Sequence, residues 1–277
     1  MEIDYTKHPN ESRTPYLNLA RTYKEKNFMV GQVKLVEDKI LLLERILENP
    51  QGALKMEAYR TLNELAAETQ YLWPQNKVLR IFFFEGQTDF AKLVLSIAKE
   101  WSIYCNIRFV VTENQGESDL RIAFNPKDGC CSYIGTIAQH ITKDEPTLNI
   151  GYLNFKTFEE MKELRRLVLH EFGHALGLIH EHQSPAFTMD WNVTYVRMWC
   201  ETKYNWTPEM VEINIFHQYS SNDIWFSHGD NKSIMAYYIP QNFTKNQVVF
   251  PLNNDLSDGD KKYIGELYPI APNIIKS

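Results

Sequence analysis

The chain has 277 residues, of which 44% are hydrophobic and 13% aromatic, so it has enough apolar material for one large core or two small ones. Its formal net charge is −6 and its lysines and arginines are scattered, which gives no basic patch for nucleic acid or for an anionic membrane surface. We therefore expect neither nucleic acid nor a membrane as a partner, and no stretch approaches the roughly 18 consecutive apolar residues of a membrane span.

The first ten residues, MEIDYTKHPN, have neither the basic nor the apolar region of a secretory signal. We expect a protein that is either cytoplasmic or exported by a route that needs no such signal. The four cysteines, Cys105, Cys130, Cys131 and Cys200, are too few and too irregular for a disulfide framework or a C-x-x-C metal site. The cysteine pattern leaves both locations open.

Residues 1–69 have the pattern of a helical segment. Val33, Val36, Ile40 and Leu43 recur at three- and four-residue spacing, and a similar apolar stripe follows the break at residues 49–52. This pattern predicts a helical hairpin with one apolar face. We interpret residues 1–69 as an accessory or pro-like segment, whose apolar face either packs on the rest of the protein or serves a partner-binding or inhibitory role.

From about residue 72 the pattern becomes mixed. Helical spacing is found at 90–104, at 159–176, at 192–204 and at 257–267, where Ser257 is a suitable N-cap. Short β-type runs predict strands at 78–84, 107–112, 119–124, 132–141 and 147–153. This order predicts an α+β fold in which a mixed sheet packs against helices.

The stretch HEFGHALGLIHEH, residues 170–182, contains four histidines and two glutamates. His170 and His174 are four residues apart on the predicted helix, so their imidazoles lie on one face and can reach the same ion. Glu171 points beside that ion, which suits a general base acting on a bound water. Gly177 lies where the helix would end in a left-handed conformation, and the resulting turn can bring His180 back as a third ligand.

Three neutral imidazoles with an open fourth position describe a catalytic zinc site. With one zinc ion on His170, His174 and His180, and Glu171 transferring a proton from the zinc-bound water, the expected chemistry is hydrolysis of peptide bonds in proteins. The alternative is a non-catalytic binding module that keeps zinc for stability. His182 is left over, and we expect it either behind the ligands or on the surface.

The spacing HExxHxxGxxH, present here as HEFGHALGLIH, resembles that of the metzincin metalloproteases. The resemblance implies a tight turn whose methionine lies under the metal without binding it, and SIMAYY (233–238) places Met235 at that position. Glu181, immediately after the third histidine, resembles the astacin branch in particular.

A tyrosine two residues after the methionine can bind zinc in astacins and swing away to stabilise the oxyanion. The resemblance therefore implies a catalytic role for Tyr237, which has this offset from Met235. The adjacent Tyr238 is the alternative, and the offset favours Tyr237.

Stretches on both sides of the motif are also similar to astacin-like catalytic domains, so that the resemblance covers about 70–270. It implies a metzincin fold, with a twisted mixed β-sheet, an active-site helix and a mostly irregular C-terminal subdomain. The implied domain is 70–277, with an upper subdomain at about 70–177 and a lower one at about 178–277. A protein or peptide substrate would bind in extended form along an edge strand near 132–141.

The chain also departs from the astacin pattern. Cys130 matches an astacin disulfide cysteine, but residues 147–169 contain no cysteine to pair with it, which implies different cross-linking. No cysteine precedes Cys105, and FMVGQ (28–32) has a glutamine where an aspartate switch needs a carboxylate, so residues 1–69 do not resemble a standard propeptide. Without a secretory signal, an exported effector or toxin acting on another cell's proteins is an alternative biological role.

Overall fold

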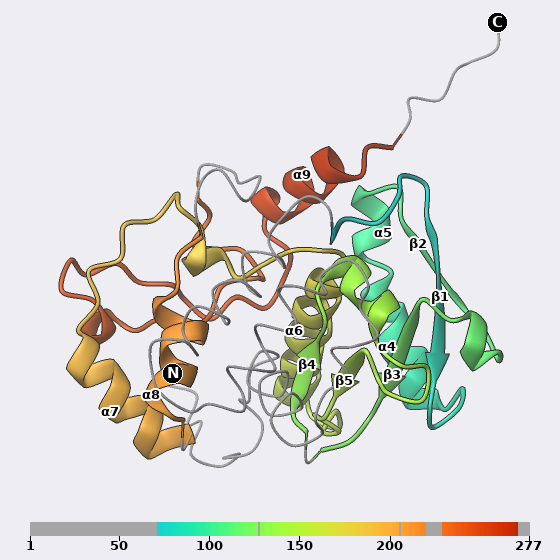
Figure 1. Ribbon diagram of the computed structural model, residues 1–277, viewed down its shortest axis with the longest axis horizontal. Helices are drawn as coiled ribbons and strands as arrows, with labels where there is room; N and C mark the ends of the chain where they lie inside the picture. Colours follow the sequence, from blue (N-terminus) through green and yellow to red (C-terminus); the bar gives the residue numbers. More distant parts are fainter. Residues whose placement is uncertain (1–70, 127, 205, 220–228, 271–277) are drawn as a thin grey trace, which may run out of the picture.

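A computed structural model describes residues 71–126, 128–204, 206–219 and 229–270 (Figure 1). The predicted helical segment at 1–69 lies outside the described residues. The described part contains a sheet flanked by helices, followed by a region of short helices and long irregular connections. Within these residues, no helix combines the length and the apolar character that crossing a membrane requires.

The sheet has five strands in the order β2-β1-β3-β5-β4. The first four strands in this order pair in parallel, and β4 pairs with β5 in the antiparallel direction and lies at one edge. The predicted α+β architecture with a mixed sheet is therefore confirmed. The bounds of the strands are β1 Val78–Phe83, β2 Arg108–Val111, β3 Leu120–Ala123, β4 Cys130–Ser132 and β5 Leu148–Ile150.

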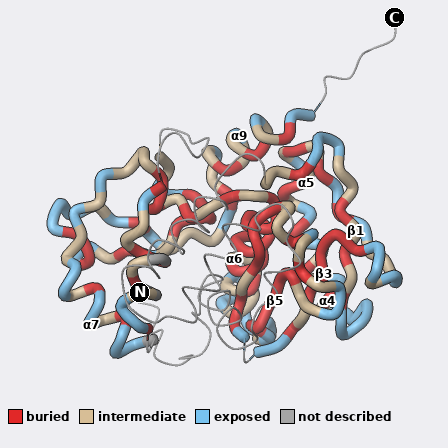
Figure 2. The backbone as a smooth tube through the Cα atoms, viewed as in Figure 1, coloured by how far each residue is buried: buried red, intermediate tan, exposed pale blue. Residues whose placement is uncertain are grey.

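The main core lies between the sheet and the helices next to it. Alternate residues of β1 are buried, because one face of the strand is turned toward apolar neighbours. Helix α6 (Phe158–Ala175) passes next to α4 (Asp89–Ala98), β4 and β5. Figure 2 shows buried residues concentrated along α6 and the strands. The active-site helix predicted at 159–176 is thus a central element of this core.

The helix predicted at 90–104 is wrong in one respect, because two helices occupy this stretch. The first, α4, begins after Thr88, whose side chain accepts a hydrogen bond from the backbone N–H of Ala91, and the second, α5, spans Trp101–Tyr104. Trp101 is fully buried and donates a hydrogen bond from Nε1 to the carbonyl oxygen of Leu169 in α6 at 3.0 Å. This hydrogen bond ties α5 to the neighbouring helix α6.

The strand predicted at 132–141 is wrong over most of its length. Within it only Ser132 belongs to a strand, as the last residue of β4, and Gly135–His140 form a 3-10 helix, η6. Gly135 has a φ of +49°, and a Cβ there would lie 2.0 Å from the carbonyl oxygen of Tyr71, so the chain turns where an extended strand was expected. The edge strand predicted near 132–141 is therefore shorter and lies at 130–132.

A buried arginine holds this turned segment against the sheet. Arg121 of β3 is fully buried and donates hydrogen bonds to the carbonyl oxygens of Ala138, Ile141 and Glu145. These carbonyls would otherwise need partners from a neighbouring strand. Burial lowers the pKa of the guanidinium, but the charged side chain remains the donor that three backbone oxygens share.

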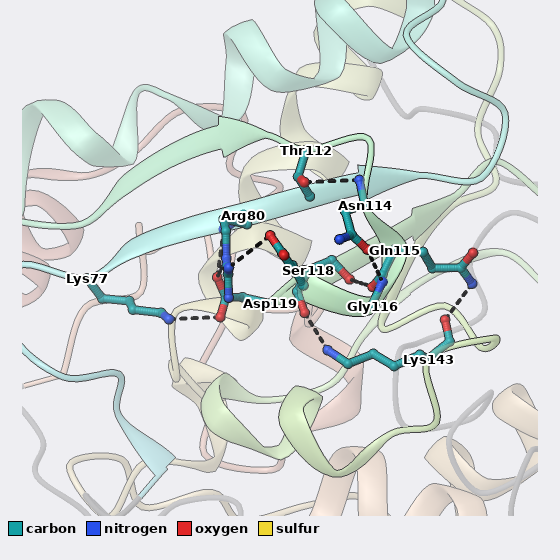
Figure 3. A network of polar contacts seen from close by, with 10 residues as sticks. Lys77, Arg80, Thr112, Asn114, Gln115, Gly116, Ser118, Asp119 and Lys143 are labelled. Atoms are coloured by element: carbon teal, nitrogen blue, oxygen red, sulfur yellow. Dashed lines mark hydrogen bonds and ion pairs between the residues drawn. The ribbon is translucent and has the colours of Figure 1, made fainter.

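A polar network also ties the same loop to the residues just before β3 (Figure 3). Asp119 accepts a hydrogen bond from the backbone N–H of Arg80 at 2.8 Å and forms an ion pair with Lys77 at 2.8 Å. Lys143 donates from Nζ to the carbonyl oxygen of Ser118 at 2.6 Å. The loop between η6 and β5 is therefore held against the central strand β3, by Arg121 and by the carbonyl oxygen of Ser118.

The chain after α6 contains the helices predicted at 192–204 and 257–267. The second of these begins with a capping box, in which Ser257 and Asp260 each accept a hydrogen bond from the other's backbone N–H. A second apolar cluster forms in this region around Val196, Trp206 and Phe250. The helices are α7 Val193–Tyr204, α8 Pro208–Val211 and α9 Asp258–Leu267, with a π-helical turn η8 at Glu212–Phe216 and 3-10 helices η5 Gln115–Glu117, η7 Glu181–Gln183 and η9 Gln241–Phe243.

Candidate metal centre

Helix α6 carries His170 and His174 on one buried face. The helix begins at Thr157, whose side chain forms a capping box with Glu160, and its last two turns are buried at every position. A helix held at both ends in this way keeps two side chains four residues apart in a fixed relation. The sequence-based placement of these two histidines on one helix face is confirmed.

Gly177 ends the helix and redirects the chain. Its φ is +102°, and a Cβ at this position would lie 2.8 Å from Cδ2 of Leu72. The turn is closed by hydrogen bonds from the backbone N–H of Leu178 to the carbonyl oxygen of Gly173 at 3.0 Å, and from Gly177 to His174 at 2.8 Å. The left-handed conformation predicted for Gly177 is confirmed, and the chain beyond it brings His180 beside the two helix histidines.

The Nε2 atoms of His170, His174 and His180 converge on one point. They lie 3.2 Å apart for His170 and His174, 3.2 Å for His174 and His180, and 3.3 Å for His170 and His180. Two nitrogens bound at about 2.0–2.1 Å to one zinc ion in tetrahedral geometry lie about 3.3 Å apart. The three side chains therefore fit a zinc ion without moving.

The hydrogen bonds at the other ring nitrogens decide the tautomers. Nδ1 of His170 contacts the carbonyl oxygen of Ile234 and Nδ1 of His174 that of Leu178, each at 2.8 Å, while Nδ1 of His180 contacts Oε1 of Gln183 at 3.3 Å. A carbonyl oxygen can only accept a hydrogen bond, so each Nδ1 carries the proton and each Nε2 presents a lone pair. Three lone pairs directed at each other at 3.2–3.3 Å repel unless a cation lies between them.

Burial keeps these imidazoles neutral. It lowers the pKa of His170 and His180 well below the usual range and lowers the pKa of His174 to about 4. Neutral imidazole is the form that binds a metal. Within the described ranges, these three form the one set of His, Cys, Asp and Glu side chains placed to share an ion.

Glu171 is buried next to the histidine cluster. Burial raises the pKa of its carboxyl well above the usual range, and the positive charge of Arg166 opposes this shift. Its Oε2 atom accepts no hydrogen bond from any described residue. A buried carboxyl oxygen without a protein donor is a suitable acceptor for a water molecule or a substrate N–H.

The turn that contains Met235 lies against α6. A Cβ at Gly173 would be 2.3 Å from Sδ of Met235, so the helix backbone rests directly on the sulfur. Asp260 of α9 accepts hydrogen bonds from the backbone N–H of Ile234 at 2.7 Å and from Oγ of Ser233 at 2.6 Å. Because the carbonyl oxygen of Ile234 accepts the hydrogen bond from His170, α9 supports the metal centre through this turn.

Tyr237 is the tyrosine that faces the histidines. Its ring centroid lies 4.0 Å from that of His180 and 6.0 Å from that of His170. The side chain of Tyr238 is 49% exposed. The structure therefore brings Tyr237 to His170 and His180, while Tyr238 faces solvent.

His182 is buried behind the cluster, which is one of the two positions expected for it. Its ring stacks on those of Tyr237 and His180, with centroids 5.0 and 5.5 Å away. Its Nε2 contacts the carbonyl oxygen of Asn214 at 3.1 Å, so the proton lies on Nε2 and the lone pair on Nδ1. This tautomer is the reverse of that in the other three histidines, and His182 does not share their convergence point.

Three supporting residues were not found from the sequence. Asp260 was visible only as the third residue of a helix that starts at Ser257, a pattern that predicts a cap and not a link to Met235. Gln183 and the carbonyl of Ile234 gave no sequence pattern at all.

Glu181, which accepts a hydrogen bond from the backbone N–H of Asp230 at 2.9 Å, has a carboxyl pKa that burial raises to about 7.

All four cysteines fall within the described residues, and none of them forms a disulfide bond there. Cys130 of β4 is buried, and burial raises the pKa of its thiol to about 12. Among the described residues, no cross-link corresponds to the astacin disulfide that Cys130 would otherwise form.

Comparisons with known proteins identify similar sequences and structures. The model of the peptidase family described as Astacin matches residues 65–269. A solved structure of myroilysin is 35% identical with a TM-score of 0.70, and the match covers 74% of this chain and 99% of that chain. A crystal structure of myroilysin is 34% identical with a TM-score of 0.55, and that match covers 72% of this chain and 86% of the other. The zinc metalloproteinase nas-39 of Caenorhabditis elegans is 23% identical over 218 residues, which are 76% of this chain and 22% of that protein, so the chain spans less than a quarter of this relative.

Proposed function

The chain belongs to the astacin family of peptidases, and from this premise we propose that it is a zinc endopeptidase that hydrolyses peptide bonds in proteins. The observation that carries the proposal is the convergence of three Nε2 lone pairs on one point, each fixed by a hydrogen bond at Nδ1. Three histidines leave one tetrahedral position open, which is the arrangement of catalytic and not of structural zinc sites.

Zinc would be held by His170, His174 and His180. When bound in such a site, zinc lowers the pKa of a water ligand to about 7 and polarises a carbonyl group. The positive charge of Arg166 lowers the pKa of the Glu171 carboxyl, against the effect of burial, and a bound zinc ion would act in the same direction.

Glu171 would carry the proton during hydrolysis. Its Oε2 is buried and accepts no hydrogen bond from a described residue, so it can accept a proton from the attacking water. The same carboxyl group would then donate this proton to the nitrogen of the leaving amine. Water and peptide are thereby converted into a carboxylic acid and an amine, and Glu171 returns to its starting state.

The substrate would bind along β4. Among the described residues this strand lies at the edge of the sheet and pairs only with β5, so its other edge would be the one to pair with an extended peptide. Helix α6 contacts β4, so a peptide paired with this edge would pass beside the histidines. Any protein segment that can unfold locally can adopt an extended main chain. Main-chain pairing with β4 would therefore give no preference for particular substrate side chains by itself.

Tyr237→Phe is expected to lower kcat by roughly 10–100-fold with a smaller effect on KM. Its phenol group would donate a hydrogen bond to the oxyanion, and loss of one such donor costs on the order of 10²-fold or more where it is fully engaged. Steady-state kinetics on a fluorogenic peptide measure the split. Tyr238→Phe is the matched control and is expected to stay within about twofold, because that side chain faces solvent. The reverse result would assign the role to Tyr238.

Casein cleavage by the full-length protein tests the function itself. We expect cleavage that is lost when a chelator removes zinc and is restored when zinc is added back. Metal analysis of the same sample should give one zinc ion per chain. A protein that binds zinc but cleaves neither casein nor a broad peptide library would instead be a zinc-stabilised binding module.

A further inference from the structure

We propose that Gln183 is the positioning residue for the third zinc ligand, and that its carboxamide oxygen sets the ring orientation of His180. The inference rests on the proposed function, since it concerns the same zinc centre. It names a side chain that makes no contact with the ion but determines how strongly the ion is held.

The three ligands differ in how their Nδ1 protons are held. His170 and His174 lie on α6, and each donates to a backbone carbonyl at 2.8 Å, so no substitution of a side chain removes either acceptor. His180 lies beyond the helix, at the start of η7, and its Nδ1 acceptor is a side-chain oxygen, Oε1 of Gln183. The third ligand is therefore the one whose orientation depends on a replaceable side chain.

The position of Gln183 suits this role. The side chain is buried, and both of its backbone groups are engaged. Its N–H donates to the carbonyl oxygen of His180 at 3.1 Å, and its carbonyl oxygen accepts from the N–H of Tyr219 at 2.9 Å. A backbone fixed on both sides delivers the carboxamide to His180 at little entropic cost.

The ring contacts of His180 do not replace this hydrogen bond. The rings of His182 and Tyr237 stack on or tilt against the imidazole, and these contacts limit ring movement without specifying which nitrogen carries the proton. If the acceptor at Nδ1 is removed, the proton can move to Nε2, where it blocks the lone pair that would bind zinc. Partners of this kind behind a ligand typically contribute about 10–100-fold to metal affinity.

The experiment measures zinc affinity of the full-length protein directly, by competition with a chromophoric chelator at constant pH. Gln183→Leu, which keeps the size but removes the acceptor, is expected to raise the Kd for zinc by about 10–100-fold. Gln183→Glu keeps an acceptor and adds charge, so its Kd is expected to equal or fall below that of the parent. Gln241→Leu, the same change at an exposed glutamine, should leave the Kd within about twofold.

The experiment distinguishes failure of this inference from failure of the proposed function. A folded Gln183→Leu protein that binds zinc as tightly as the parent overturns the role of Gln183, while casein cleavage by the parent would leave the proposed function standing. If Gln183→Leu does not fold, as judged by circular dichroism, Gln183→Glu decides the question, and a Kd raised tenfold or more in that variant overturns the inference. A parent protein that binds no zinc would defeat the proposed function and this inference together.

Discussion

Replacing Glu171 with glutamine is expected to lower kcat for peptide cleavage by about 10²–10⁴-fold while one zinc ion stays bound per chain. The substitution preserves the size of the side chain and removes its ability to accept and return a proton. The three histidines keep their Nδ1 partners at Ile234, Leu178 and Gln183, none of which involves Glu171. Metal analysis and kinetics on the same preparation measure the two effects independently.

Glu159→Gln provides the control for this experiment. Glu159 lies in the first turn of the same helix and is exposed, so the variant has the same change in charge far from the histidines. We expect its kcat to stay within about twofold of the parent. Turnover retained by Glu171→Gln at a similar level would show that another group transfers the proton.

Replacing His180 with alanine is expected to abolish cleavage and to weaken zinc binding by at least about 100-fold. Structural zinc sites with four ligands bind with roughly 10–16 kcal/mol, so that each ligand contributes about 3 kcal/mol, or two orders of magnitude in Kd. The same chelator competition measures this loss. The rise in the Kd for zinc should equal or exceed that of Gln183→Leu, which removes only the hydrogen bond to His180.

His182→Ala is the matched variant, because this histidine is equally buried and lies two residues away. Its proton is on Nε2 and its lone pair is outside the convergence point, so we expect the protein to retain one zinc ion per chain. Circular dichroism of both proteins without zinc shows whether either change prevents folding. A loss of zinc in His182→Ala as large as in His180→Ala would contradict the tautomers assigned to the four histidines.

The parts of the site that follow local rules were predictable from the sequence. The spacing of His170 and His174 fixes their common face on a helix, and Gly177 is the residue type that a left-handed helix end requires. The strands at β1, β2, β3 and β5 were also predicted, because each is a short run of apolar and β-branched residues. In all these cases the information lies within a few residues of the feature.

The failures have tertiary causes. The stretch 132–141 has the composition of a strand, but Arg121 supplies hydrogen bonds to its carbonyls, and Tyr71 occupies the space beside Gly135. Both partners are distant in sequence, so no local pattern announces them. Gln183 and Asp260 were missed for the same reason, since the group that each supports is identified only by the fold.

The contact between Gly173 and Met235 has a consequence for how this sequence can diverge. A Cβ at Gly173 would meet the sulfur of Met235 at 2.3 Å, with Trp101 closing the other side at 3.3 Å. A side chain at position 173 therefore requires Met235 to shift or to be replaced, although the two positions lie far apart in the sequence. Among descendants of this chain, we expect a larger residue at position 173 to be accompanied by a displaced or a smaller side chain at position 235, so the tolerance of position 173 depends on a residue outside its own helix.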